Sequence, residues 1–308
     1  MEHDDWPSLA LADWEPTYLT LHRWTQIVGK VALSNAPYVN HWWHVALHVT
    51  SAGLTVSVPC DRRFVTMTFD LDAHRMIVHT SDKRTESFAL EPMTVAEFYD
   101  RLMAALGRLD VRVHVWPVPV EVSDVTPFTD DRHHAAYDRP RVERFHRALL
   151  SIERVFEIHR GRFGGKCSPV HFFWGAFDLA VTRFSGRTNP NPPEDSVMRE
   201  AYSHEVISHG FWPGGEEPIF YAYAVPEPEG LRRAKVEPQA AHYDETLGEV
   251  VLPYEAVRTS AEPERMLLDF MESTYLAAAQ LAGWDIKALR APVLIGRTDR
   301  AAPPVSRV

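Results

Sequence analysis

The sequence predicts an α+β fold in which two modules, each of a helix, antiparallel strands and a helix, form a tandem repeat with one shared core. A similar sequence pattern occurs twice: Leu21-His22-Arg23 precedes His41-Trp42-Trp43-His44, and Phe145-His146-Arg147 precedes His171-Phe172-Phe173-Trp174. In both halves several β-like segments follow one another without a helix between them, which is typical of antiparallel sheets.

The first half opens with apolar residues at helical spacing, namely Leu21, Trp24, Val28 and Val31. Four β-like segments follow, at residues 54–58, 64–69, 76–80 and 86–90. Thr94-Val95-Ala96-Glu97 is a capping-box pattern and predicts the start of a closing helix.

The second half repeats this order. Phe145, Ala148, Ile152 and Val155 predict its first helix, residues 202–207, 219–224 and 249–253 its strands, and the residues after Thr259 its closing helix. We therefore expect a first α+β half at residues 1–130, a linker at 131–140, a second α+β half at 141–290 and an extended C-terminal tail at 291–308.

Composition narrows the function classes. Lys and Arg total 32 against 42 for Asp and Glu, a net charge of −10 without a basic patch, which argues against nucleic acid as a partner. The start of the chain lacks the pattern of a secretory signal, no run is long enough to span a membrane, and the two cysteines, Cys60 and Cys167, form no CxxC pair. We expect a soluble cytoplasmic protein with no membrane partner; its oligomeric state stays open.

Histidines head both aromatic segments, which we expect to be strands. Alternation places His41 on the same face as Trp43 and Val45, and His44 on the other face, so the two histidines cannot chelate a metal on one strand. In the second copy, His171 shares a face with Phe173, and Asp178 lies on the opposite face.

An active site at the junction of the halves is the first functional hypothesis. Its predicted catalytic residues are His41, His171, His204 and Glu205. The three histidines could bind a transition metal, zinc or iron, with Glu205, Asp178 or Asp70 as a carboxylate ligand, or a histidine could act alone as acid or base near neutral pH.

Ligand contacts are expected from aromatic and basic residues near these histidines. Trp43, Phe173, Tyr202 and Trp212 would wall a small-molecule site, and Lys166 and Arg183 would hold an acidic end of the ligand. Cys167 lies near His171 in sequence, but we expect it to be a buried structural residue.

The chain has no Walker loop, GxGxxG, GxSxG or HExxH motif. It resembles a bacterial family known as domain-of-unknown-function family 5996, from about Trp6 to Trp284. The resemblance is carried by WTQIVGK from Trp24, NHWWHV from Asn40, KCSPVHFFWGAFDLAVTRFSGR from Lys166, EAYSHEV from Glu200, GFWPGG from Gly210 and LPYEAVR from Leu252. It implies a single full-length unit and brings no activity with it.

Three hypotheses follow from the sequence. The first is an enzyme acting on a small molecule at the histidine-lined junction, with or without a metal. The second is a noncatalytic protein that binds an apolar or sugar-like ligand in an aromatic pocket, and the third is a structural or interaction module. Whether the protein is an enzyme at all is left open by the sequence.

Overall fold

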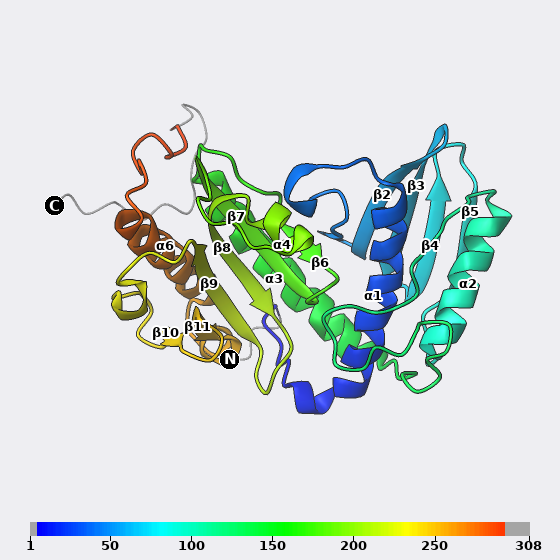
Figure 1. Ribbon diagram of the computed structural model, residues 1–308. Coiled ribbons are helices and arrows are strands. Elements are labelled where there is room, and N and C mark those ends of the chain that lie inside the picture. Colours follow the sequence, from blue (N-terminus) through cyan, green and yellow to red (C-terminus); the bar gives the residue numbers. More distant parts are fainter. Residues whose placement is uncertain (1–4, 293–308) are drawn as a thin grey trace.

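The computed structural model describes residues 5–292 and confirms an α+β fold, with two antiparallel sheets and six α-helices in that range (Figure 1). The first half runs through α1 (Glu15–Asn35), β1 (His48–Thr50), β2 (Gly53–Cys60), β3 (Arg63–Asp70), β4 (Arg75–Thr80), β5 (Thr85–Ala89) and α2 (Val95–Arg108). The second half runs through α3 (Arg139–Gly161), β6 (His171–Phe173), β7 (Asp178–Thr188), α4 (Ser196–Ala201), β8 (His204–Trp212), β9 (Ile219–Val225), β10 (His242–Asp244), β11 (Glu249–Pro253), α5 (Tyr254–Arg258) and α6 (Pro263–Leu281).

The predicted helices are confirmed where the apolar spacing was helical. Leu21, Trp24, Val28 and Val31 of α1 are fully buried, as are Phe145, Ala148 and Ile152 of α3. At the start of α2, Thr94 Oγ1 accepts a hydrogen bond from Glu97 N over 3.1 Å, so the predicted cap is present.

Each sheet is antiparallel and is covered by helices on one face. The first has the order β1-β2-β3-β4-β5 and the second the order β10-β11-β9-β8-β7-β6. Helices α1 and α2 cover the first sheet, where Trp24 stacks on Phe98 at 4.8 Å between ring centroids. Helices α3 and α6 cover one face of the second sheet, where His209 of β8 bonds to Thr274 of α6.

The two sheets meet edge to edge. Leu47 lies just before β1, and Phe172 lies in β6. Leu47 N donates to the carbonyl of Phe172 over 2.9 Å, and Phe172 N donates to that of Leu47 over 2.7 Å. This antiparallel bridge links the sheet edges, and the buried side chains of both halves form one large core. The order helix, strands, helix occurs in both halves, whereas their origin by duplication stays a prediction.

The predicted strand at His41 is wrong. Residues Asn40–Trp42 form a 3₁₀ turn and extended structure begins only at His48. In the second copy the chain reverses after β6, and β7 starts at Asp178 directly opposite Phe173. Paired residues share a face, so Asp178 lies on the same face as His171, contrary to the expectation from simple alternation.

The predicted linker packs against the first half. Asp131 is buried beside Arg23 of α1, with 3.4 Å between Nε and Oδ2, and it accepts hydrogen bonds from the amides of His133 and His134. The predicted domain boundaries stay predictions. The structure describes residues up to 292, so all of the predicted tail except residues 291 and 292 lies outside the described residues. In the described part of the chain, no helix is long and apolar enough to cross a membrane.

Candidate functional site

The turn that carries His41 is held in an unusual backbone conformation by the second half. His41 and Trp42 have φ of 57° and 62°, the left-handed region that few residues with a side chain adopt. His41 N donates to Glu200 Oε1 over 2.8 Å, and Trp42 Nε1 donates to the carbonyl of Val197 over 2.9 Å. Helix α4 therefore clamps this turn, and Figure 1 shows the segment after α1 reaching toward it.

The imidazole of His41 has one orientation and one tautomer. Its Nδ1 lies 3.1 Å from the carbonyl oxygen of Glu200 and 3.3 Å from that of Ala201. Carbonyl oxygens only accept, so Nδ1 carries the proton and Nε2 has a free lone pair. Lys166 Nζ donates to this Nε2 over 2.7 Å.

Aromatic rings surround the pair. His41 lies 4.5 Å from Phe184, 5.4 Å from Trp43 and 5.5 Å from His204, measured between ring centroids. Lys166 Nζ lies 4.8 Å above the Phe184 ring and 5.6 Å above the Trp43 ring. At this site, His41 and Trp43 of the first half contact Lys166 and His204 of the second half.

The surroundings shift the protonation equilibria of the pair. Desolvation lowers the pKa of Lys166, and desolvation together with the charge of Lys166 lowers the pKa of His41. Burial opposes ionisation of Glu200, but hydrogen bonds from Tyr38 and from His41 N lower the pKa of this carboxyl. A carboxylate therefore stands beside the Lys166 and His41 pair.

His171 does not join His41 and His204. It is 1% exposed, its ring packs on Phe173 at 4.4 Å, and neither ring nitrogen has a hydrogen-bond partner in the structure. Burial lowers the pKa of His171 to about 3, which makes it a neutral core imidazole near pH 7. Between residues 5 and 292, no group of three or more His, Cys, Asp or Glu side chains is placed to hold a metal. The predicted zinc or iron site of His41, His171 and His204 therefore has no matching ligand group.

Arg183 does not hold a ligand at this site. It points from β7 toward α3 and α6, where its guanidinium bonds the carbonyl of His159 and lies 3.2 Å from Glu272 Oε1. The ring of Tyr275 lies 4.3 Å from this guanidinium. Arg183 belongs to a buried histidine network behind the sheet, in which the rings of His159 and His209 lie 4.7 Å apart.

Glu205 also faces away from the His41 site. Alternation along β8 places it opposite His204, as the sequence predicted, and it accepts hydrogen bonds from Ser185 Oγ at 2.9 Å and Arg187 Nε at 2.8 Å. Its geometry is that of an ion-paired sheet residue.

The face of the second sheet that points away from α3 and α6 is called the inner face here. Strand register places on it His171, Phe173, Asp178, Thr182, Phe184, His204, Ser208, Trp212, Tyr221, Tyr223 and Glu249. Three hydroxyls bridge neighbouring strands: Thr182 Oγ1 and Ser208 Oγ lie 2.9 Å apart, and Ser208 also bonds to Tyr223. Tyr202 donates to the hydroxyl of Tyr223 over 3.1 Å.

An acid centre lies further along this face. Tyr221 donates a hydrogen bond to Asp178 Oδ2. Burial, opposed by this bond and reinforced by Glu121, raises the pKa of Asp178 to about 7. Burial and the charge of Asp178 raise the pKa of Glu249 to about 7.

Glu121 reaches the acid centre from a loop of the first half. Gln26 of α1 anchors that loop, because its side-chain amide donates to the carbonyl of Val120 over 2.7 Å and accepts from Val120 N over 2.8 Å. A Cβ at Gly175 would lie 2.2 Å from Glu121 Oε1, so the carboxyl packs directly against the backbone of the turn between β6 and β7. Both halves therefore contribute to the acid centre.

Sequence reasoning missed most of the acid centre. Tyr221 and Tyr223 alternate in Ile219-Phe-Tyr-Ala-Tyr-Ala-Val, a pattern that marks one face of a strand and was available as a signal. Asp178 was considered only as a metal ligand. Nothing in the sequence near Glu121 indicates that a loop carboxyl would reach a strand of the other half.

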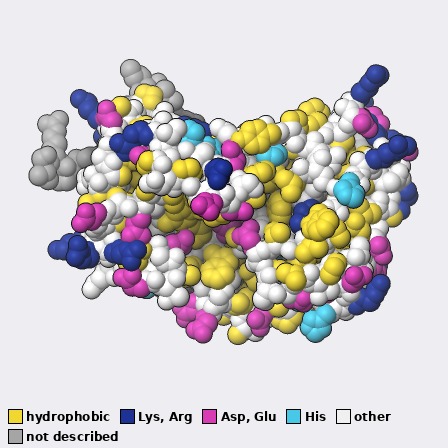
Figure 2. Space-filling model, in the orientation of Figure 1, with side chains coloured by type: hydrophobic (Ala, Val, Ile, Leu, Met, Phe, Trp, Pro, Cys, Tyr) yellow, Lys and Arg dark blue, Asp and Glu magenta, His cyan; other side chains and the backbone are white. Residues whose placement is uncertain are grey.

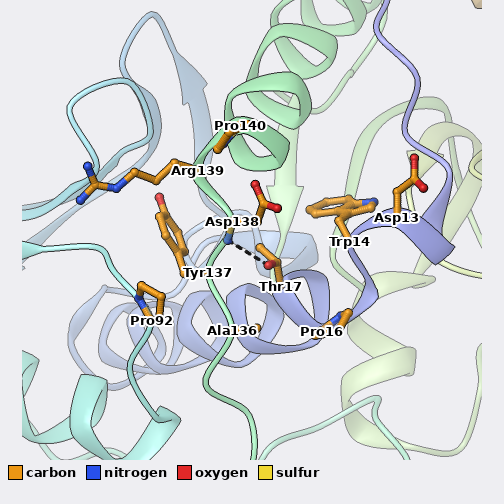
Figure 3. Close-up of a pocket in the computed structure, with 10 residues that line it drawn as sticks. All are labelled: Asp13, Trp14, Pro16, Thr17, Pro92, Ala136, Tyr137, Asp138, Arg139 and Pro140. Atoms are coloured by element: carbon orange, nitrogen blue, oxygen red, sulfur yellow. Dashed lines mark hydrogen bonds between the residues drawn. The ribbon is translucent and has the colours of Figure 1, made fainter.

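Two hollows are visible on the surface. Figure 2 shows the molecule hollowed between its two halves, with acidic and hydrophobic side chains gathered there. Another hollow, of about 650 Å³, lies at the starts of α1 and α3, where Thr17 Oγ1 accepts from Asp138 N over 3.0 Å (Figure 3). None of the predicted site residues lines the second hollow.

Comparison with known proteins gives a family and no activity. Neither the curated proteins nor the solved structures contain a match to this chain. A protein-family model, described as a family of unknown function, matches residues 6–291. The chain therefore belongs to the DUF5996 family.

Proposed function

We propose that the protein is an enzyme that acts on a small molecule bound between its two halves, against the inner face of the second sheet. One observation carries this proposal: Lys166 Nζ contacts His41 Nε2 at 2.7 Å, and two backbone carbonyls hold the His41 ring. A nucleophile in hydrogen-bond contact with a base, which a third group orients in turn, is the arrangement of many covalent enzymes.

His41 has the role of base and Lys166 that of a reactive amine. The lowered pKa of Lys166 increases its neutral fraction near pH 7, and the neutral amine is the nucleophile. The Trp43 and Phe184 rings lie against the amine of Lys166, and the His204 ring lies beside His41. This chemistry requires no metal, because imidazole accepts and returns protons near neutral pH by itself.

The charges around the site favour a neutral or cationic ligand. The Glu200 carboxylate lies beside the Lys166 and His41 pair, while Arg183, which was expected to hold an acidic ligand, lies behind the sheet. Lys166 is engaged with His41. An anionic ligand would therefore meet repulsion from this carboxylate, which Arg183 does not offset.

A noncatalytic binding protein is the second candidate. It is favoured by the aromatic side of the inner face, where Tyr202, Tyr223 and Tyr221 form a row with ring centroids 6.1 and 5.9 Å apart. Such rings bind apolar bodies and organic cations without any chemistry at His41.

Screening a metabolite library distinguishes the two candidates. Compounds that raise the melting temperature are incubated with the protein, and their consumption is followed by mass spectrometry. We expect His41→Gln to slow turnover by about 10²- to 10⁴-fold, the usual contribution of a general base, with ligand binding retained. The control is His79→Gln, at an exposed histidine of β4, which should leave turnover unchanged.

If ligands bind but are never consumed, the noncatalytic binding protein becomes the better hypothesis and the enzyme hypothesis is rejected. A library that produces neither melting shifts nor turnover would count against both, in favour of a structural or interaction module.

A further inference from the structure

We propose that Lys166 forms a Schiff base with the carbonyl group of an aldehyde or ketone, with His41 as the base that takes its proton. The inference rests on the proposed enzymatic role of Lys166 and His41 and adds the reacting group of the substrate. It is independent of the acid centre, because Asp178 and Phe184 stand six residues apart on β7, about 20 Å at roughly 3.3 Å per residue.

The backbone around Lys166 fixes the direction of its side chain. Residues 166–168 run along the edge of β7: Phe184 N donates to the carbonyl of Lys166 over 3.0 Å, and Ser168 N donates to that of Thr182 over 2.9 Å. Alternation then separates neighbouring side chains. Lys166 reaches His41 on the inner side, while Cys167 is turned into the protein.

The neighbouring thiol is a poor alternative nucleophile. Burial raises the pKa of Cys167 to about 11, so the thiolate, its reactive form, is scarce near neutral pH. Lys166 is partly exposed, as Cys167 is, but it lies beside a base and two aromatic rings. The more reactive nucleophile is therefore the amine, and amines in proteins form Schiff bases with carbonyl substrates.

The left-handed turn at His41 positions the imidazole against Lys166. A left-handed backbone is strained for a residue with a side chain, and here the bond from His41 N to Glu200 holds His41 at φ 57°. The result is that Nε2 points at Lys166 while Nδ1 is occupied by carbonyls. An ordinary extended backbone, which alternation predicts for this segment, would not require that clamp.

The reaction balances without an additional reagent. Lys166 gives one proton to His41 Nε2, and the neutral amine forms a C–N bond to the carbonyl carbon. The carbonyl oxygen takes two protons, one returned by His41 and one from the nitrogen of the adduct, and leaves as water, so amine and carbonyl become imine and water with no change of oxidation state. The protonated imine keeps its positive charge over the Phe184 and Trp43 rings, 4.8 and 5.6 Å from the nitrogen position, where cation–π attraction stabilises it.

Trapping with propanal tests the proposal on the whole protein. Sodium cyanoborohydride reduces the C=N bond and makes the adduct permanent, and peptides carrying each of the five lysines are quantified by mass spectrometry. At about pH 7 we expect Lys166 to be alkylated faster than the exposed Lys83, Lys235 and Lys287, because a lowered pKa raises the fraction of neutral amine. A Lys166 rate equal to or below theirs overturns the proposal. This comparison needs no variant.

The variant His41→Gln tests the base. Glutamine accepts a hydrogen bond but cannot take the proton, so the Lys166 rate should fall toward that of the exposed lysines and its pH profile should move toward theirs. His79→Gln is the matched control and should leave the rate unchanged, with circular dichroism reporting the fold of both. An unchanged Lys166 rate and pH profile in folded His41→Gln would remove His41 from the reaction.

Trace acetylation with acetic anhydride separates this inference from the proposed function. Fast acetylation of Lys166 without alkylation by propanal would exclude a carbonyl substrate but keep the activated amine. Equal acetylation of Lys166 and the exposed lysines would overturn both proposals.

Discussion

Replacing Asp178 by asparagine tests the electrostatics of the inner face. The asparagine side chain can still accept the hydrogen bond from Tyr221, but it cannot ionise. The pKa of Asp178 is about 7 in the folded protein against 3.8 for an ordinary aspartate, with burial as the main cause. Above about pH 4 the unfolded chain therefore loses a proton that the folded protein still holds, and the folded protein loses it only near pH 7.

The sign and size of the effect follow from these two values. A carboxyl whose pKa is raised on folding opposes folding increasingly from about pH 4, and the effect is complete above about pH 7. The difference between 3.8 and about 7 corresponds to about 4 kcal/mol, because one pH unit is worth about 1.4 kcal/mol. Relative to the wild type, Asp178→Asn should therefore become more stable by up to about 4 kcal/mol between pH 4 and pH 8.

Urea unfolding followed by circular dichroism at several pH values measures this difference directly. Glu249→Gln should show the same direction, since the pKa of Glu249 is also raised to about 7. Asp244→Asn is a control of opposite sign, because the backbone amides of Leu247 and Thr246 lower the pKa of Asp244. A stability difference between Asp178→Asn and the wild type that stays constant from pH 4 to pH 8 would refute the reasoning.

Two further predictions concern packing and the buried ion pair. In α1, Gly29→Ala would place a Cβ 2.1 Å from the indole of Trp174, so we expect a loss of about 1–3 kcal/mol in urea unfolding. The control Gly107→Ala, in α2 with nothing within 4 Å, should gain up to about 1 kcal/mol; equal effects would show that the Trp174 contact does not matter. Glu272→Gln leaves buried Arg183 without its carboxylate partner and should lower stability by about 1.5–3 kcal/mol. Glu264→Gln, in the exposed pair with Arg154, should lower it by less than about 1 kcal/mol, and an equal loss in the two would contradict the burial argument.

Periodicity predicted the elements that bury one face. The α1 positions Leu21, Trp24 and Val28 and the β9 pattern from Ile219 follow directly from spacing, because burying one side of a helix or strand requires apolar residues at its period. The segment from His41 to Leu47 alternates as a strand would, yet it forms a turn. Glu200 and Val197 of a distant helix hold it there, and no local pattern records those bonds.

The candidate site was predicted in part. His41, Trp43, Lys166 and His204 meet as neighbours, while Tyr202 joins the tyrosine row. His171 was grouped with them because it begins the second copy of the repeated aromatic pattern, but it lies in the core beside Phe173. Arg183 follows a strand as a ligand-binding arginine often does, but alternation points it behind the sheet toward Glu272.

Local spacing was thus sufficient for the α+β class, the four long helices α1, α2, α3 and α6, most of the strands and the opposite faces of His204 and Glu205. The pairing of Lys166 with His41, 125 residues away, arises only when β1 and β6 join the two sheets at their edges. The same holds for the acid centre, where a loop anchored by Gln26 brings Glu121 to Asp178. The physical reason is range: side-chain periodicity reports burial within a segment, whereas hydrogen bonds and charge between halves depend on a register that is set only when the whole chain packs.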